Sequence, residues 1–392
     1  MHPLARLAEL FETRGALVAG VLSGTSADGI DVALCRMRTR GGVLERPELC
    51  AFQTFAFPAD QARALRAVLD GEVCLLRESA LLSRDLGRSF GAAARALAER
   101  EGLALDLVGS HGQTVYHHDG REESGPASLQ LGEGDHVAEA AGCACVSDFR
   151  QRDLAAGGEG APLSALADGL VFAHLARPLA LLNLGGMGNL TLLEEDGGVL
   201  AFDTGPAGSL LDGLARALLG RDFDPSGETA ARGVADPQRV RRWLEHPFFE
   251  RPPPRSTGRD TFGAEWVRAC LAEGGRAEDL LATAVEFVAT TVAQGLERFA
   301  RSRPRELVVA GGGVHHLPLL GRIGALSGLP VASSAERGVD PDAREGLVFA
   351  VLAARAVLGT PSTLRSATRA APGRVLGKIS LPSVADATTG GR

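Results

Sequence analysis

Four glycine-containing segments carry the residues best suited to chemistry, and the first covers residues 23–31. It reads Ser-Gly-Thr-Ser-Ala-Asp-Gly-Ile-Asp. Its glycines let successive N–H groups converge on an anion, its hydroxyls can donate to that anion, and Asp28 or Asp31 can hold a hydrated Mg²⁺. The segment is therefore a candidate phosphate-binding loop. A plain hairpin turn is the alternative, because Asp-Gly is a strong turn signal.

Polar groups of several kinds follow one another in the second segment, residues 109–114. It reads Gly-Ser-His-Gly-Gln-Thr and comes after an apolar run at 105–108, so we expect a loop after a strand. The mixture of donors and acceptors suits a sugar with many hydroxyls better than a phosphate. The candidate sugar contacts are Ser110, His111 and Gln113. A purely structural role is the alternative for the histidine.

Two arginines follow further along, at positions 150 and 152. Arg150 and Arg152 could clamp a carboxylate, because a guanidinium binds a carboxylate through two parallel hydrogen bonds. The alternative is a surface salt bridge with the neighbouring Asp148 or Asp153, which the spacing allows equally well.

The third segment contains the leading candidate for a catalytic base, Asp203. This aspartate follows an apolar run, 197–202, and precedes Gly205 and a helix predicted from Pro206. A carboxylate at the end of a strand is well placed to act as a general base or to hold a metal. A turn residue or helix N-cap would show the same pattern.

The fourth segment consists of three consecutive glycines, Gly311, Gly312 and Gly313. They stand between an apolar run at 306–310 and a helix predicted from His316. Glycine permits a flat ligand such as adenine or ribose to approach the backbone, and a helix N-terminus favours anions. A loop selected for tight packing is the alternative.

Alternating strand and helix patterns are expected to position these segments in an α/β fold. In the first half, strands at 15–22, 30–37 and 44–57 precede helices at 60–69 and 75–101. The second half repeats this order, with strands at 179–184, 190–193 and 197–202, a Gly-Gly loop from Gly185 and then a helix. The repetition predicts two related lobes that face each other, with a small-molecule site in the cleft between them.

Composition excludes several functions. Lys378 is the single lysine among 41 cationic residues, and it lacks the spacing of a P-loop or protein-kinase lysine. If the chain uses ATP, backbone amides, arginine and metal must neutralise the phosphates. The net charge of −7 without a basic block disfavours nucleic acid. No apolar run reaches the length of a membrane span, so we expect a cytoplasmic enzyme that is not bound to membranes.

Taken in order, the segments resemble the anhydro-N-acetylmuramic acid kinase family from about residue 20 to residue 381. Each motif alone is weak, but their shared order is specific. The matching stretches are 20–31, 109–114, 148–162, 183–189, 202–206, 256–259, 311–313 and 344–346. One departure is Ala207, where the family usually has glycine; an alanine would be strained there if the position needed positive φ.

The resemblance implies a two-lobed actin-like ATPase (ribonuclease H-like) fold, each lobe a mixed sheet flanked by helices, with the active site in the cleft. We expect lobe I to comprise residues 1–150, completed by 360–392, and lobe II to comprise 151–359. The implied ATP contacts are Gly24, Thr25, Ser26, Ala27, Asp28, Gly29, Ile30 and Asp31 in a first phosphate loop, Gly185, Gly186 and Asn189 in a second, and Gly311, Gly312 and Gly313 near the adenosine.

The resemblance also implies a reaction. Water attacks the anomeric carbon of 1,6-anhydro-N-acetylmuramic acid while O6 takes the γ-phosphoryl group of ATP, which yields N-acetylmuramic acid 6-phosphate and ADP for cell-wall recycling. Asp203 matches the family's general base. Expected sugar contacts are Ser110, His111, Gln113, Arg150 and Glu345. ATP and Mg²⁺ are the implied cofactors, with Asp28 as a candidate metal ligand and a homodimer as one expected assembly.

Two alternatives stay open at this point. A kinase of the same fold could phosphorylate a free sugar hydroxyl, with Asp203 deprotonating the alcohol instead of water. Less in keeping with the sugar-type segments, the chain could be a non-catalytic, ATP-gated binding protein.

Overall fold

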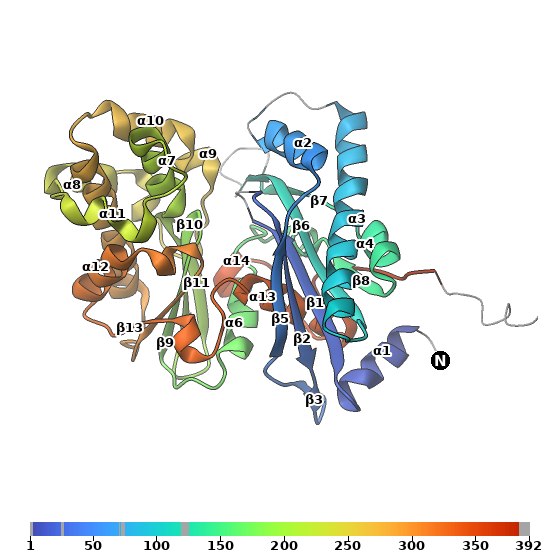
Figure 1. The fold of residues 1–392 in the computed structure, drawn as a ribbon. Helices are drawn as coiled ribbons and strands as arrows, with labels where there is room; N and C mark the ends of the chain where they lie inside the picture. Colours follow the sequence, from blue (N-terminus) through green and yellow to red (C-terminus); the bar gives the residue numbers. More distant parts are fainter. Residues whose placement is uncertain (1–2, 25–26, 70, 72–74, 119–124, 384–392) are drawn as a thin grey trace, which may run out of the picture.

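The computed structural model describes residues 3–24, 27–69, 71, 75–118 and 125–383. Two mixed sheets organise these residues, and Figure 1 shows them side by side, with α6, α13 and α14 between them. Among the described residues, no helix combines the length and apolar character that a membrane span requires.

The first sheet has the strand order β14-β8-β6-β1-β2-β5, with β7 paired to β6. Strands β1, β2 and β5 pair antiparallel. On the other side of β1, β6 pairs parallel with β1 and β8 pairs parallel with β6. The bounds are β1 (Ala16–Ser23), β2 (Ile30–Met37), β5 (Glu48–Phe55), β6 (Leu107–His118), β7 (Ala127–Leu131), β8 (Ala144–Ser147) and β14 (Lys378–Ser380), beside the small β3 (Thr39–Arg40) and β4 (Val43–Leu44) pair.

The second sheet repeats the arrangement in the order β11-β10-β9-β12-β13. Three antiparallel strands are again followed by two parallel ones. The bounds are β9 (Leu179–Leu184), β10 (Met187–Leu193), β11 (Val199–Pro206), β12 (Leu307–Ala310) and β13 (Val331–Ser333). The shared order confirms the predicted α/β fold with two lobes of actin-like topology.

Helices cover both sheets. The bounds on the first side are α1 (Pro3–Glu12), α2 (Ala59–Leu69), α3 (Leu76–Arg100) and α4 (Gly134–Ala141); on the second, α7 (Gly208–Leu219), α8 (Pro237–Leu244), α9 (Arg259–Phe262), α10 (Ala264–Ala272), α11 (Ala277–Phe299) and α12 (Leu317–Ser327); and at the junction, α5 (Phe149–Leu154), α6 (Ser164–Val171), α13 (Arg344–Val357) and α14 (Arg365–Thr368). The predicted helices at 60–69 and 75–101 correspond closely to α2 and α3.

Two stretches that we expected to be loops are strands, which corrects the sequence interpretation. Residues 109–114 lie inside β6, where they pair with β1 and β7, and residues 187–189 open β10. Ladder partners satisfy their backbone N–H and C=O groups, and this outweighs the low strand propensity of glycine. Only Gly185 and Gly186 form the turn between β9 and β10.

Helix α13 lies unusually close to the first sheet because glycines face it. A Cβ on Gly20 would lie 1.7 Å from the carbonyl oxygen of Gly346, and one on Gly109 would lie 2.3 Å from that of Phe349. Since a side chain at either position would displace the helix, α13 packs directly on the first sheet.

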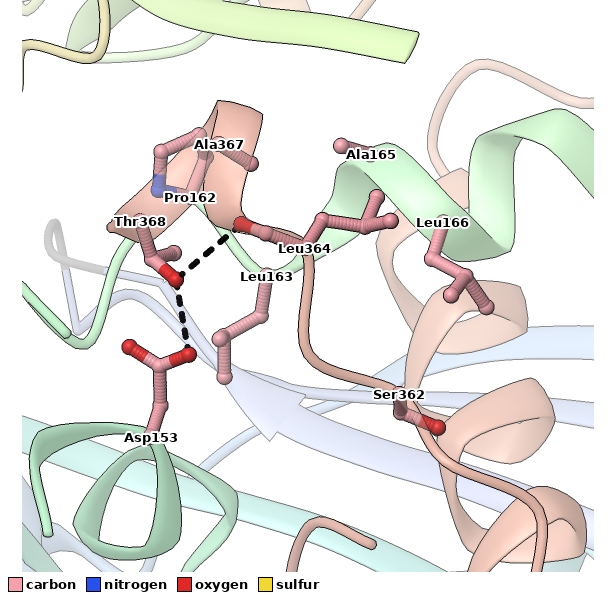
Figure 2. A pocket seen from close by; sticks show the side chains of 9 residues that line it. All are labelled: Asp153, Pro162, Leu163, Ala165, Leu166, Ser362, Leu364, Ala367 and Thr368. Carbon is pink, nitrogen blue, oxygen red and sulfur yellow. Dashed lines mark hydrogen bonds between the residues drawn. The ribbon is translucent and has the colours of Figure 1, made fainter. Parts of the chain in front are cut away.

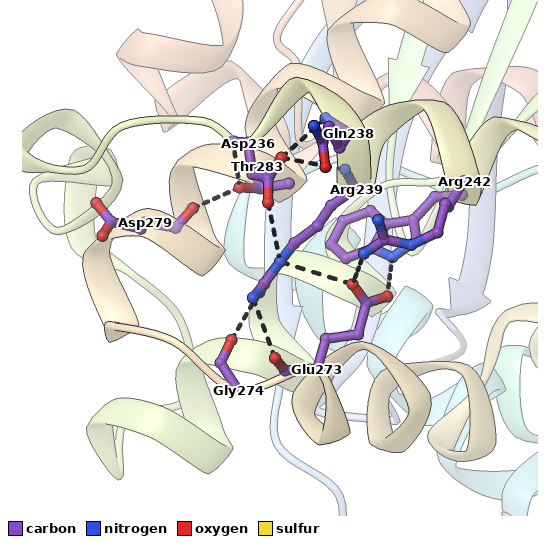
Figure 3. Close-up of polar contacts among 9 residues, drawn as sticks. Asp236, Gln238, Arg239, Arg242, Glu273, Gly274, Asp279 and Thr283 are labelled. Atoms are coloured by element: carbon purple, nitrogen blue, oxygen red, sulfur yellow. Dashed lines mark hydrogen bonds and ion pairs between the residues drawn. The ribbon is translucent and has the colours of Figure 1, made fainter.

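A polar cluster holds the helical layer of the second lobe together (Figure 3). The indole N–H of Trp243 on α8 donates to Glu273 Oε1 at 2.8 Å, and Arg242 pairs with the other carboxylate oxygen. Arg239 donates to the carbonyl oxygens of Glu273 and Gly274 at 3.0 and 2.6 Å. These contacts fix the turn after α10 against α8.

Replacing Glu273 with alanine is expected to lower the free energy of unfolding by about 1–3 kcal/mol. The buried indole of Trp243, which is 4% exposed, would lose its acceptor. Urea denaturation measures the change. The matched control is Glu265→Ala on α10, whose side chain is 95% exposed; we expect a change within about 0.5 kcal/mol there. Equal effects in the two variants would contradict the assignment.

Candidate active site

Asp203 lies near the end of β11, and both of its carboxylate oxygens accept a hydrogen bond. Asn189 Nδ2, on the neighbouring β10, donates to Oδ1 at 3.0 Å. The backbone N–H of Thr257 donates to Oδ2 at 2.8 Å. The side chain is only 8% exposed, so two fixed donors hold a buried carboxylate in one orientation.

The surroundings of Asp203 raise the basicity of its carboxylate. Burial raises the pKa of Asp203 to about 6, although its hydrogen bonds and the charges of Arg255 and Arg150 oppose the shift. A carboxylate with this pKa is ionised at neutral pH and is a stronger base than an ordinary aspartate. The position therefore meets the requirements of a general base.

Arg150 and His111, both expected to contact the sugar, contact each other. Arg150 Nε donates to His111 Nε2 at 3.0 Å, and His111 Nδ1 lies 3.2 Å from the carbonyl oxygen of Gly112. Because a guanidinium can only donate, the histidine must carry its proton on Nδ1 and donate it to that carbonyl. Burial holds the pKa of His111 well below its usual value, in agreement with this neutral form.

The positive charge of Arg150 interacts with two carboxylates, those of Glu345 on α13 and Asp203 on β11. Burial lowers the pKa of Arg150 to about 10, and the charges of Glu345 and Asp203 oppose the shift. The guanidinium also donates from Nη1 to the carbonyl oxygen of Gly160 at 2.7 Å. The structure thus brings together three residues that are far apart in the chain: Arg150, Asp203 and Glu345.

The side chains of Arg150 and Arg152 do not face a common position where they could clamp one carboxylate. Arg152 is exposed on α5, while the side chain of Arg150 is turned toward His111. Two residues apart on a helix, the side chains leave in different directions. Asp148, a suggested partner for them, pairs instead with Lys378 Nζ at 2.5 Å.

Glu345 connects the two lobes at the start of α13. Asn183 Nδ2 of β9 donates to Glu345 Oε1 at 3.2 Å. On its other side Asn183 lies against Gly311, where a Cβ would be 2.8 Å from Oδ1. The sugar-contact candidate Glu345 and the first glycine of the adenosine candidate therefore share one neighbour.

The first phosphate-loop candidate joins β1 to β2, and the predicted contacts Thr25 and Ser26 lie outside the described residues. The backbone N–H of Ala27 donates to the carbonyl oxygen of Gly24 at 3.1 Å, and Gln113 Nε2 donates to the same oxygen at 3.1 Å. Gly29 packs against Thr54, since a Cβ there would lie 2.5 Å from its methyl group. Ile30 is buried in the core, so only its backbone is available to a ligand.

Carboxylates gather beside this loop. Asp28 is exposed, and Asp31 accepts from the hydroxyl of Thr54 at 2.6 Å. Burial and the nearby charges of Asp28 and Glu345 raise the pKa of Asp31. A cation would relieve this repulsion, so the donor set fits Mg²⁺, which binds through one or two carboxylates, water and phosphate oxygens. Among the described residues, no group of three His, Cys, Asp or Glu forms a closed metal cage.

The turn formed by Gly185 and Gly186 is fixed on the start of α7. The N–H of Gly208 donates to the carbonyl oxygen of Gly185, and that of Ala207 to the carbonyl oxygen of Gly186, each at 2.9 Å. The φ angle of Ala207 is −128°, so this position does not use positive φ and the alanine carries no left-handed strain. Asn189 belongs to β10 and contacts Asp203 rather than standing in the turn.

The three glycines after β12 differ in their surroundings. Gly312 has open space where a Cβ would be, while Gly313 packs against Leu184, with 2.4 Å between a Cβ and that side chain. Gly311 has φ of +81°, which favours glycine. Tight packing therefore explains two of the three, and Gly312 is the one open to a ligand.

Ser110 and Gln113 are placed differently from His111. Ser110 pairs in parallel register with Ser147, which abuts Gly134 of α4, so Ser110 points to the α4 side of the sheet. His111 instead packs against Phe349 of α13, with 4.5 Å between the two ring centres. Gln113 is fully buried and reaches the first phosphate-loop candidate. The structure therefore groups Gln113 with that loop and separates Ser110 from the Arg150 side.

A small, partly open pocket is lined in part by Ala367 and Thr368 of α14 (Figure 2). The hydroxyl of Thr368 donates to Asp153 Oδ1 at 2.8 Å, and the N–H of Gly160 donates to Oδ2 at 2.9 Å. The volume is about 10 Å³, room for about one water molecule. The two hydrogen bonds to Asp153 hold the loop that contains Gly160. The carbonyl oxygen of Gly160 in turn accepts the hydrogen bond from Arg150 Nη1.

Sequence reasoning missed two residues that hold Asp203. Thr257 and Arg255 lie directly after a proline-rich stretch, residues 247–254, that carries no local signal of a catalytic role. Thr257 belongs to a stretch shared with the family, which was a usable signal. Arg255 immediately precedes that stretch, and no local pattern marks a side chain whose partner is 52 residues away.

Comparison with known proteins agrees with the geometry. A family model described as anhydro-N-acetylmuramic acid kinase matches residues 16–382. A relative of that name from Xanthomonas oryzae pv. oryzae (strain MAFF 311018) is 42% identical over 370 residues, covering 93% of this chain and 97% of the relative. Another of that name, from Gloeobacter violaceus (strain ATCC 29082 / PCC 7421), is 37% identical over 374 residues, covering 93% and 98%. The chain therefore belongs to the anhydro-N-acetylmuramic acid kinase family and is a phosphotransferase.

Proposed function

We propose that the protein uses ATP and Mg²⁺ to open the 1,6-anhydro bond of anhydro-N-acetylmuramic acid and to phosphorylate O6. The products are N-acetylmuramic acid 6-phosphate and ADP. The observation that carries the proposal is the buried Asp203 carboxyl, with a pKa of about 6 and both oxygens held, beside the charges of Arg150 and Arg255. Family membership supports the choice of sugar.

In the proposed reaction Asp203 takes a proton from the water that attacks C1. The C1–O6 bond breaks, its electron pair goes to O6, and O6 forms a bond to the γ-phosphorus as ADP leaves. Because an unprotonated sugar oxygen is a poor leaving group, capture by the phosphoryl group removes its developing charge. In this proposal Arg150 attracts the carboxylate of the sugar's lactyl group. The hydrogen bond from Arg150 Nε to His111 Nε2 supports that role, because it fixes one edge of the guanidinium.

The nucleotide would lie along the glycine-containing turns. The backbone at Gly24, Ala27, Gly185 and Gly186 is proposed to face its phosphates, and the open position at Gly312 its adenosine. Asp28 and Asp31 would hold a hydrated Mg²⁺, which neutralises phosphate charge when it is bound.

A kinase for a free sugar hydroxyl is the alternative, and labelled water separates the two. With anhydro-N-acetylmuramic acid and Mg-ATP in H₂¹⁸O, the proposed reaction places solvent oxygen at C1 of the phosphorylated product. A parallel incubation of unlabelled product corrects for exchange at the anomeric centre. Phosphorylation of N-acetylmuramic acid, with no turnover of the anhydro sugar, would favour the alternative.

The pH dependence of kcat/KM is expected to report Asp203. The residue acts as a base only when ionised, so kcat/KM should rise about tenfold per pH unit at low pH and level off above about pH 6. A pH–rate profile under limiting sugar measures the midpoint. A midpoint at about pH 4, the ordinary pKa of aspartate, would contradict the conclusion that burial raises the pKa of Asp203.

We further propose a cytoplasmic enzyme that acts in the recycling of cell-wall muropeptides and assembles as a homodimer. Family membership is the support for the pathway. Sedimentation of the purified chain would test the assembly, because a homodimer must have twice the mass of 40.7 kDa.

A further inference from the structure

Arg255 is a buried arginine whose hydrogen bonds go to backbone carbonyl oxygens. The residue is 3% exposed. Its Nε donates to the carbonyl oxygen of Asp203 at 3.0 Å, and its Nη1 donates to those of Arg251, Phe249 and Phe248 at 2.8, 3.2 and 3.4 Å. Burying a cation is unfavourable, so a guanidinium in such a place calls for an explanation.

Three phenylalanine rings lie close to the guanidinium of Arg255. Its central carbon lies 4.9 Å from the ring centre of Phe248, 5.4 Å from that of Phe299 and 5.5 Å from that of Phe202. Phe202 immediately precedes Asp203 on β11. Cation–π contacts partly offset the loss of water around the charge, and they fix the direction of its donors.

The chain around Arg255 grips Asp203 at three points. The N–H of Asp203 donates to the carbonyl oxygen of Arg255 at 3.0 Å, and Arg255 Nε returns a bond to the carbonyl oxygen of Asp203. Two residues further on, the N–H of Thr257 binds the carboxylate itself. Residues 255–257 therefore run beside β11 and hold both the backbone of Asp203 and one oxygen of its carboxylate.

We propose that Arg255 is a positioning residue that holds residues 255–257, and through them the Asp203 carboxylate, in the orientation required for attack by water. This inference rests on the proposed function of Asp203 as the base. The planar fork of arginine reaches the Asp203 carbonyl and the carbonyls of residues 248, 249 and 251 at the same time. A lysine ammonium keeps the charge but lacks the fork.

The test compares Arg255→Lys with a matched control, Arg298→Lys. Arg298 Nη1 also donates to the carbonyl oxygen of Phe249, at 2.9 Å, and its guanidinium lies 5.2 Å from the Phe299 ring centre. Neither of these contacts involves Asp203. We expect Arg255→Lys to lower kcat about 10- to 100-fold with little change in KM for ATP, and Arg298→Lys to keep kcat within about twofold.

A double-mutant cycle separates positioning from general stability. In the Asp203→Asn background, Arg255→Lys should cause no further loss, because no base remains to be oriented. An equal loss in both backgrounds, or near-normal kcat in the single variant, would overturn the proposal. So would a finding that neither Arg255→Lys nor Arg255→Gln folds, since Arg255 would then serve stability alone.

A second readout does not depend on turnover. The groups that act on the Asp203 carboxyl are Asn189 of β10, Thr257, Arg255 and Arg150 of α5. In protein with ¹³C-labelled aspartate, Arg255→Lys should shift the Asp203 carboxyl resonance and Arg298→Lys should not, with Asp203→Asn identifying the signal. If the wild type failed to turn over the anhydro sugar, the proposed function would fail while this result still decided the positioning.

Discussion

Replacing Asp203 with asparagine is expected to reduce kcat for anhydro-N-acetylmuramic acid at least about 10²-fold and to leave ATP binding nearly intact. The amide has nearly the same shape as the carboxylate but cannot take a proton from water. The nucleotide candidates are other residues, so the affinity for ATP should not depend on this carboxylate. Steady-state kinetics and calorimetric titration with a non-hydrolysable ATP analogue measure the two effects.

The control for this variant is Asp196→Asn. Asp196 is 64% exposed in the turn between β10 and β11, where it pairs with Arg301. We expect its kcat to match that of the wild type. Asp203→Asn with near-normal kcat would eliminate the base assignment, and a loss of ATP affinity equal to the loss of kcat would point to a binding role instead.

Replacing Asp168 with alanine is expected to lower the free energy of unfolding by about 3–5 kcal/mol. Asp168 on α6 pairs with Arg344, the first residue of α13, at 2.6 Å, and the two side chains are 0% and 3% exposed. Removing the carboxylate leaves a buried cation without its ion-pair partner. Urea unfolding followed by circular dichroism gives the change.

Two further variants test whether the loss comes from the unpaired charge. The exposed pair of Asp196 and Arg301 is the control, and Asp196→Ala should change the free energy of unfolding by less than about 1 kcal/mol. Adding Arg344→Met to Asp168→Ala should restore part of the lost stability because the buried charge is gone. A double variant less stable than Asp168→Ala would contradict this account.

The ion pair between Asp168 and Arg344 also lies next to a residue of the proposed site. Arg344 directly precedes Glu345, whose carboxylate accepts from Asn183 of the second sheet. The ion pair therefore fixes the end of α13 that carries a sugar-contact candidate. Stability and the geometry of the proposed site depend on the same helix terminus.

Much of the fold could be predicted because its signals are local. Alternating apolar residues predicted β2 with the observed bounds, and helical spacing predicted α2 and α3 to within a few residues. The errors fell on residues 109–114 and 187–189. Their glycines and polar groups resemble a loop, but ladder partners distant in the chain make them strands.

The sequence by itself predicted the two-lobed fold, because strand patterns are visible in one stretch of chain. The order of its motifs indicated the family and Asp203 as the candidate base. The tertiary structure decided which residues act on Asp203 and how. Arg255 and Thr257 reach it from more than 50 residues away, and Arg150 turns inward while Arg152 points to solvent. Burial and orientation arise from packing between distant segments, and the same packing raises the pKa of Asp203.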